Sequence, residues 1–253
     1  MTKLQNMPQQ VRTTTDATAP ANSYSTAEVQ AIYDKAYVTP GLMGTHFDRE
    51  YSAMTKRTLL QMCHAAPNPR LLDLGTGDGD LWEYADPARI WHAVDISRVG
   101  VERAKRRFAR LHPATAIAES LPFADKYFGA VVAADTMEHV FDIDKSLSEV
   151  RRILAPGGKF ALSVPAPQSL RKWAINRFLR QRPDFMMFLR LVQVVLKRRL
   201  LFGKAAFQPI DRDLSLSEWC AALEAHQFEI IKTQKWPAAP LEPIVFLIET
   251  RLR

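Results

Sequence analysis

The sequence has few cysteines and no long apolar segment near its N-terminus. The first shortage argues against a disulfide or CxxC metal site, and the second argues against a signal peptide. Cys63 and Cys220 are the only cysteines among 253 residues and stand far apart, so neither a disulfide framework nor a CxxC metal site is expected. Residues 1–23 lack the continuous apolar core of a signal peptide. We therefore expect a flexible tail over residues 1–23 and a cytoplasmic protein.

Acidic residues are scarce in one internal segment. Residues 170–204 hold ten Lys and Arg but a single acid, Asp184, so the segment carries a formal charge of +9 in a chain whose total is +7. The remainder is close to neutral, and its 47% apolar content is typical of a globular domain with a substantial core. Basic charge confined to one segment indicates a local insert rather than a nucleic-acid-binding surface.

Strand-like apolar runs alternate with helical patterns along the chain. Strands are expected within residues 70–75, 90–97, 114–119, 128–135, 158–165, 229–236 and 244–252. Helices are expected within residues 26–37, 47–64, 80–85, 98–111, 144–154 and 215–228. This order predicts an α/β fold, a doubly wound parallel sheet covered by helices on both faces, with ligands at the carboxyl ends of the strands.

Three glycines follow the first expected strand in the pattern Asp73-x-Gly75-x-Gly77-x-Gly79. Glycines here permit positive φ and a close approach of the backbone to a ligand. A dinucleotide-binding fingerprint would need a glycine where the chain has Asp80. An acid at the strand end suits a cationic ligand instead, and S-adenosylmethionine, which has a sulfonium and an ammonium group and no phosphate, is such a ligand.

Four stretches in register resemble the class I S-adenosylmethionine-dependent methyltransferases, in the methyltransferase type 11 branch that includes ubiquinone and menaquinone biosynthesis enzymes. They are LLDLGTGDGD, AVDIS, AESLPF, and VVAADTMEHV continuing into LSEVRRILAPGGKFALSVP, within about residues 70–165. The resemblance implies a seven-stranded, Rossmann-like sheet with S-adenosyl-L-methionine as cofactor. It assigns cofactor binding to Asp73, Gly75, Thr76, Gly77, Gly79, Asp95, Ile96, Ala118, Glu119 and Asp135.

The resemblance also implies a role for each part of that set. The glycine loop would wrap the methionine portion, Asp73 would hold its amino group through water, and Asp95 would accept two hydrogen bonds from the ribose diol. Ile117 stands where family members commonly have an aspartate that accepts from the adenine amino group. Adenine binding would then use the backbone of Ala118 and Glu119, with the Glu119 carboxylate as a substitute acceptor.

An acidic cluster with a histidine follows the fourth expected strand, beside the methyl group that family members transfer. Asp135, Glu138 and His139 have three interpretations: acid–base catalysis or substrate contact, a divalent-cation site, or a structural role. Our prediction assigns them to catalysis and assigns no metal. The stretch lacks the N/D-P-P-Y/F motif of enzymes that methylate nucleic-acid bases, so nucleic acid is not expected as substrate. His46 is a further histidine in the expected lid.

The chain is expected to form one methyltransferase domain over residues 24–253. Lid helices would occupy residues 24–66, and a basic helical insert would occupy residues 166–210 after the fifth strand. The insert is interpreted either as a substrate lid or as an interfacial helix that meets anionic membrane through residues 170–204.

The predicted function is methyl transfer to a hydroxyl, ahead of an amine or carbon, of a moderately hydrophobic small molecule or lipid-linked precursor. The alternatives are a cofactor-binding regulator without turnover and a peripheral membrane protein that acts through the insert.

Overall fold

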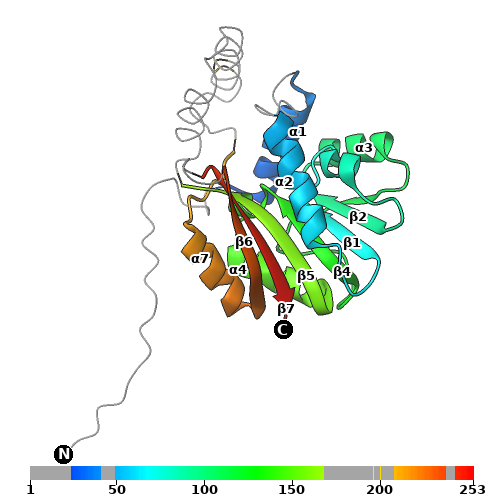
Figure 1. The fold of residues 1–253 in the computed structure, drawn as a ribbon. Helices are drawn as coiled ribbons and strands as arrows, with labels where there is room; N and C mark the ends of the chain where they lie inside the picture. Colours follow the sequence, from blue (N-terminus) through cyan, green and yellow to red (C-terminus); the bar gives the residue numbers. More distant parts are fainter. Residues whose placement is uncertain (1–23, 41–48, 168–195, 197–199, 201–207, 238–242) are drawn as a thin grey trace, which may run out of the picture.

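The structure is a computed structural model that describes residues 24–40, 49–167, 196, 200, 208–237 and 243–253 (Figure 1). The predictions of a flexible tail over residues 1–23 and of a role for His46 lie outside these residues. Most of the expected basic insert lies outside them as well. The domain boundaries at residues 24, 66, 166 and 210 therefore stay predictions.

Seven strands form one sheet in the order β3-β2-β1-β4-β5-β7-β6, which confirms the doubly wound arrangement. Their bounds are β1 Arg70–Leu74, β2 Ile90–Asp95, β3 His112–Thr115, β4 Phe128–Ala134, β5 Leu154–Pro165, β6 Phe228–Trp236 and β7 Val245–Leu252. The order reverses at β1, which pairs in parallel with β2 on one side and β4 on the other. Ligand sites of open α/β sheets form at such a reversal, beyond the carboxyl ends of the strands.

Two details of the sheet differ from the sequence prediction. The sheet is not parallel throughout, because β7 pairs antiparallel with both β5 and β6. Only residues 237–244 connect β6 to β7, too few for the crossover of a dozen or more residues that parallel neighbours need. The third strand also ends earlier than expected: pairing with β2 stops at Asp95 and Thr115, and residues 116–119 continue as a loop.

Five α-helices and two short 3₁₀ segments are assigned among the described residues. They are α1 Thr26–Val38, α2 Arg49–Met62, η2 Asp80–Tyr84, α3 Arg98–Arg107, η3 Met137–His139, α4 Ile143–Ile153 and α7 Leu216–Ala225. Capping boxes, Ser25 with Glu28 and Ser215 with Glu218, begin α1 and α7. No helix in this part of the chain is long and apolar enough to cross a membrane.

The helices cover the two faces of the sheet, with α4 and α7 on one face and α2 and α3 on the other (Figure 1). Side chains of β4 alternate between the two cores, because successive residues of a strand point to opposite faces. Val131 and Ala133 join the core under α4 and α7, whereas Ala130 and Val132 join the core under α2 and α3. Both faces are therefore buried, as the apolar sequence of β4 predicts.

Helix α1 is held near the carboxyl ends of the strands through one side chain. The Asp34 carboxylate accepts a hydrogen bond from the Ser97 hydroxyl at 2.6 Å and another from the backbone N–H of Val99 at 3.1 Å. Ser97 caps α3 and Val99 lies in its first turn. Because an acid at a helix N-terminus also interacts favourably with the helix dipole, Asp34 fixes α1 against α3.

Replacing Asp34 tests this attachment. Asp34→Ala removes both hydrogen bonds to α3, and we expect it to lower the free energy of unfolding by about 1–3 kcal/mol. Glu102→Ala is the control, since Glu102 makes an exposed pair with Arg106 within α3 and should contribute under about 0.5 kcal/mol. Urea denaturation followed by circular dichroism measures both. Equal losses from the two variants would contradict the assignment.

Candidate functional site

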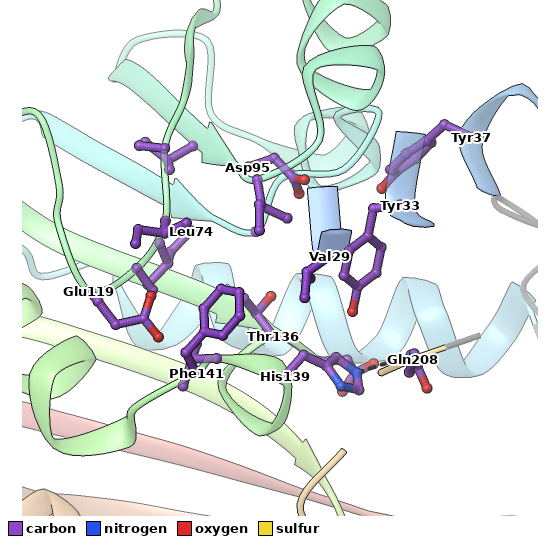
Figure 2. Close-up of a pocket in the computed structure, with 18 residues that line it drawn as sticks. Val29, Tyr33, Tyr37, Leu74, Asp95, Glu119, Thr136, His139, Phe141 and Gln208 are labelled. Carbon is purple, nitrogen blue, oxygen red and sulfur yellow. Dashed lines mark hydrogen bonds between the residues drawn. The ribbon is translucent and has the colours of Figure 1, made fainter. Parts of the chain in front are cut away.

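A pocket opens where β1, β2 and β4 end, with α1 along one side (Figure 2). It encloses about 770 Å³ that protein atoms do not fill, including solvent at its mouth, a size typical of small-molecule sites. Among the residues predicted from sequence, seven line it: Gly75, Asp95, Ile96, Ala118, Glu119, Asp135 and His139. Asp73, Thr76, Gly77, Gly79 and Glu138 lie behind this lining.

The glycine loop needs glycine for two reasons, conformation and space. Gly75 and Gly77 have φ of +78° and +57°, in the left-handed region. A Cβ on Gly75 would lie 2.2 Å from Oγ1 of Thr136, and one on Gly77 would lie 2.5 Å from the Tyr37 hydroxyl. The loop is therefore packed tightly between the end of β4 and α1, which leaves its backbone exposed to the pocket at Gly75.

Asp73 lies beneath the loop rather than in the pocket. Its side chain is buried at 2% exposure, and Oδ2 accepts a hydrogen bond from the Thr76 hydroxyl at 2.7 Å. Burial raises the pKa of Asp73 to about 7, against the lowering effect of the Thr76 bond and of Lys56. In this position Asp73 fixes the loop conformation, and its predicted contact with a ligand amino group stays a prediction.

Asp95 is held at the end of β2 by the backbone on both sides. Oδ2 accepts from the N–H of Gly77 at 2.8 Å and Oδ1 accepts from the N–H of Ser97 at 2.7 Å. Each carboxylate oxygen keeps a second lone pair, so Asp95 can still accept two further hydrogen bonds from a ligand. Burial raises the pKa of Asp95 to about 6, and the two backbone bonds oppose that rise.

The loop after β3 supplies an apolar wall and one carboxylate. Ile117 and Ala118 line the pocket together with Val94 of β2. Glu119 also lines it, and its Oε1 accepts from the backbone N–H of Asp142 at 3.0 Å. Glu119 is therefore a fixed acceptor beside an apolar surface, and its role toward an adenine stays a prediction.

Asp135 follows β4 in a strained conformation, with φ of +50° in a residue that is not glycine. Its N–H donates to Oγ of Ser163 at 3.0 Å, while Oγ–H of Ser163 donates back to Oδ1 at 2.8 Å. The Tyr51 hydroxyl of α2 donates to Oδ2 at 3.1 Å. These contacts across β5 and α2 hold the Asp135 carboxylate in a defined position at the pocket.

Glu138 and His139 lie in the turn that follows. Glu138 is 2% exposed, and among the described residues its Oε2 has no hydrogen-bond partner. Burial raises the pKa of Glu138 well above its usual range, which favours the neutral acid. In the described ranges, no group of three or more His, Cys, Asp and Glu side chains is arranged to hold a metal ion.

The ring of His139 makes one hydrogen bond at each nitrogen. Nδ1 lies 2.7 Å from the carbonyl oxygen of Ile210, and Nε2 lies 3.0 Å from the side-chain amide nitrogen of Gln208. A carbonyl can only accept, so Nδ1 carries the proton, and Nε2 of the neutral ring is the acceptor. Burial lowers the pKa of His139 below its ordinary value, which favours this neutral form.

Several lining residues were missed by the sequence prediction. Tyr33 and Tyr37 come from α1, Thr136 and Phe141 follow β4, and Gln208 lies near the end of the predicted insert. In Figure 2 the Tyr33 hydroxyl points toward the side of the pocket that holds His139 and Gln208. The spacing of Tyr33 and Tyr37 by four residues, on one helix face, was the available signal; nothing in the sequence marks Gln208.

Part of this chain is similar in sequence to known methyltransferases. A family model described as a methyltransferase domain matches residues 72–162, which run from the middle of β1 through β2, β3 and β4 into β5. The ubiquinone/menaquinone biosynthesis C-methyltransferase UbiE of Vibrio parahaemolyticus is 34% identical over 130 residues, which cover 46% of this chain and 50% of the relative. The chain therefore spans about half the length of the curated relative it matches.

Solved structures share the fold at low sequence identity. The geranyl diphosphate C-methyltransferase of Streptomyces coelicolor, solved with S-adenosyl-L-homocysteine, has a TM-score of 0.63 at 13% identity and covers 94% of this chain and 100% of its own. The cyclase SpnF has a TM-score of 0.64 at 17% identity and covers 90% and 96%. These likenesses show the fold alone, because the sequence identities are only 13% and 17%. Residues 72–162 of this chain are thus similar in sequence to a methyltransferase domain, and its fold is the one shared by solved S-adenosylmethionine-dependent methyltransferases.

Proposed function

We propose that this protein binds S-adenosyl-L-methionine and transfers its methyl group to a hydroxyl of a moderately hydrophobic small molecule. One observation carries the proposal: a single pocket joins Asp95, which has two acceptor positions left, to His139, whose Nε2 is a proton acceptor. The first suits a ribose diol and the second suits the proton of an acceptor hydroxyl.

The residues of the pocket fit the cofactor in shape and charge. The backbone at Gly75 would lie against the methionine portion, Asp95 would bind the ribose, and the wall of Ile117, Ala118 and Glu119 would contain the adenine. Three acids, Asp95, Glu119 and Asp135, line the pocket, and their charge favours a sulfonium and ammonium ligand over a phosphate.

When bound, the cofactor supplies an electrophilic methyl carbon, whose bond to sulfur breaks with its electron pair left on the sulfur. The protein's part is to orient the acceptor oxygen in line with that bond and to exclude water. Nε2 of His139 would take the hydroxyl proton as the oxygen forms its bond to the methyl carbon, and would pass it to solvent afterwards. Asp135, held by Ser163 and Tyr51, would fix the acceptor end of the pocket.

The apolar walls support an acceptor that is largely hydrophobic, and Tyr33 and Phe141 supply aromatic surface. The relative named above is a C-methyltransferase of quinone biosynthesis. A conjugated hydroxyl, once deprotonated, can react at oxygen or at an adjacent carbon, so His139 would serve either outcome. Mass spectrometry and NMR of the product would identify the atom that is methylated.

A lipid-linked acceptor and contact of residues 170–204 with anionic membrane remain part of this proposal. Its test is flotation of the full chain with anionic and neutral liposomes, with deletion of residues 170–204 as the control. Flotation by neutral and anionic vesicles alike would remove the electrostatic contact from the proposal.

The assignment of Asp95 predicts the effect of removing its charge. Asp95→Asn should weaken S-adenosyl-L-methionine binding about 10- to 100-fold, because a hydrogen bond to a charged group contributes about 1.5–3 kcal/mol. Asp86→Asn is the matched control, since the Asp86 side chain lies in a loop and contacts Ala88 and Arg89 there. Isothermal titration calorimetry measures both. Unchanged affinity in Asp95→Asn would sink the cofactor assignment.

The raised pKa of Asp95 predicts a pH dependence of binding. Because burial stabilises the neutral acid, the free protein holds this proton until the pH approaches 6, whereas the ribose and the cationic cofactor favour the carboxylate. Affinity should therefore rise between pH 5 and 7, with a proton released near pH 6. Titrations in buffers of different ionisation enthalpy measure the release. Asp95→Asn should lack it, and an equal release in that variant would assign it to another group.

Loss of the His139 imidazole should lower turnover more than binding. His139→Ala should reduce kcat about 10²- to 10⁴-fold while cofactor affinity changes little, because general-base catalysis contributes a factor of that size. The assay follows S-adenosyl-L-homocysteine release with a panel of hydroxylated apolar acceptors. His226→Ala is the control, since His226 caps α7 away from the pocket. Cofactor binding without turnover across the panel would favour the regulatory alternative.

A further inference from the structure

Four hydrogen bonds join Ile210 and Arg212 to the turn after β4. The N–H of Arg212 donates to the Glu138 carbonyl at 3.1 Å, and its guanidinium donates to the carbonyls of Val140 and Phe141. The carbonyl of Ile210 accepts from Nδ1 of His139. The short segment 208–212 includes the last residues of the predicted insert, 208–210, so the end of the insert is tied to the turn that carries the proposed base.

Gln208, in the same segment, forms a hydrogen bond with Nε2 of His139, the nitrogen proposed to act as the base. Its amide nitrogen lies 3.0 Å from Nε2 of His139, and Gln208 itself lines the pocket (Figure 2). With Nδ1 protonated, Nε2 can only accept, so the amide must present its N–H₂ group there. The Gln208 amide thus takes the position that a donating hydroxyl of the acceptor would need.

We propose that Gln208 is a positioning residue for the methyl transfer: its amide keeps Nε2 of His139 in the proton-accepting state and marks the site that the acceptor hydroxyl enters. The inference rests on the proposed function for its chemistry, but the contact between Gln208 and His139 stands without it. On acceptor binding, the hydroxyl replaces the amide at Nε2. When the ring later carries the proton, rotation of the amide offers its oxygen to Nε2–H.

The nearby carboxylates lie too far from the His139 ring to replace the hydrogen bond that Gln208 makes to Nε2. Oε1 of Glu138 lies 3.6 Å from Nε2 and Oδ1 of Asp211 lies 3.9 Å from Nδ1, both too long for a strong hydrogen bond. Asp211 and Asp135 raise the pKa of His139, Arg212 lowers it, and burial, the largest influence, lowers it further. Glu138 is held neutral by its own burial, and Tyr33 of α1 faces this end of the pocket as a neutral phenol.

The test changes the amide to a group that can only accept. In Gln208→Glu the carboxylate stabilises the imidazolium, so the pKa of His139 should rise by about 1–3 pH units. NMR titration of the ¹⁵N-labelled imidazole measures this in the full chain without any substrate. The rising limb of kcat against pH should move to higher pH by the same amount. Gln234→Glu is the matched control, because it adds the same charge on β6 and should leave both readouts as in wild type.

Gln208→Met separates positioning from folding. It keeps the side-chain length but removes the donor, so kcat should fall several-fold with little change in the pH limb, while the Ile210 carbonyl still holds the ring proton on Nδ1. A purely structural Gln208 would give Glu and Met variants with the same loss of stability and an unmoved His139 titration, which would overturn the proposal. If wild type shows the coupled titration but no methyl transfer, the proposed function fails while the Gln208–His139 contact stands.

Discussion

The site depends on the close approach of two loops, those that follow β1 and β4. Gly75 and Thr136 pack so closely that a methyl group on Gly75 would overlap the Thr136 side chain. This contact sets the distance between the glycine loop and the turn that bears Asp135 and His139. It forms because β1 and β4 are parallel neighbours in register, with Leu74 beside Ala133, so their carboxyl ends lie at the same edge.

Burial of acidic groups gives the pocket its chemical character. Burial raises the pKa values of Asp73 and Asp95, and it raises the pKa of Glu138 well above its usual range. Such groups would be stabilised as carboxylates by a cation in the pocket. Burial makes the ionised forms of Asp73 and Asp95 unfavourable, so a positively charged ligand that stabilises them is favoured. Asp135, in contrast, is exposed and is held in place by hydrogen bonds.

Most helices and strands could be predicted from local sequence, whereas the errors concern features that depend on contacts between distant segments. The strands and helices were predicted because each carries its own periodicity and caps, such as the Ser25 and Ser215 capping boxes. The antiparallel orientation of β7 was not predicted, because an apolar run in the sequence does not indicate the direction in which the strand pairs. The end of β3 was placed too late because Ala116 and Ile117 are as apolar as a strand, although pairing with β2 has already ended.

The sequence by itself determined the glycine loop and the acids that end β1 and β2, because positive φ and a carboxylate at a strand end are demands on single residues. Tertiary structure decided which of them reach the pocket: Asp73 is buried beneath the glycine loop, whereas Asp95 lines the pocket. It also brought Tyr33 and Gln208 to His139, from segments roughly a hundred residues and seventy residues away in the chain. No local pattern encodes such a contact, since it arises only when the sheet order fixes which loops share an edge.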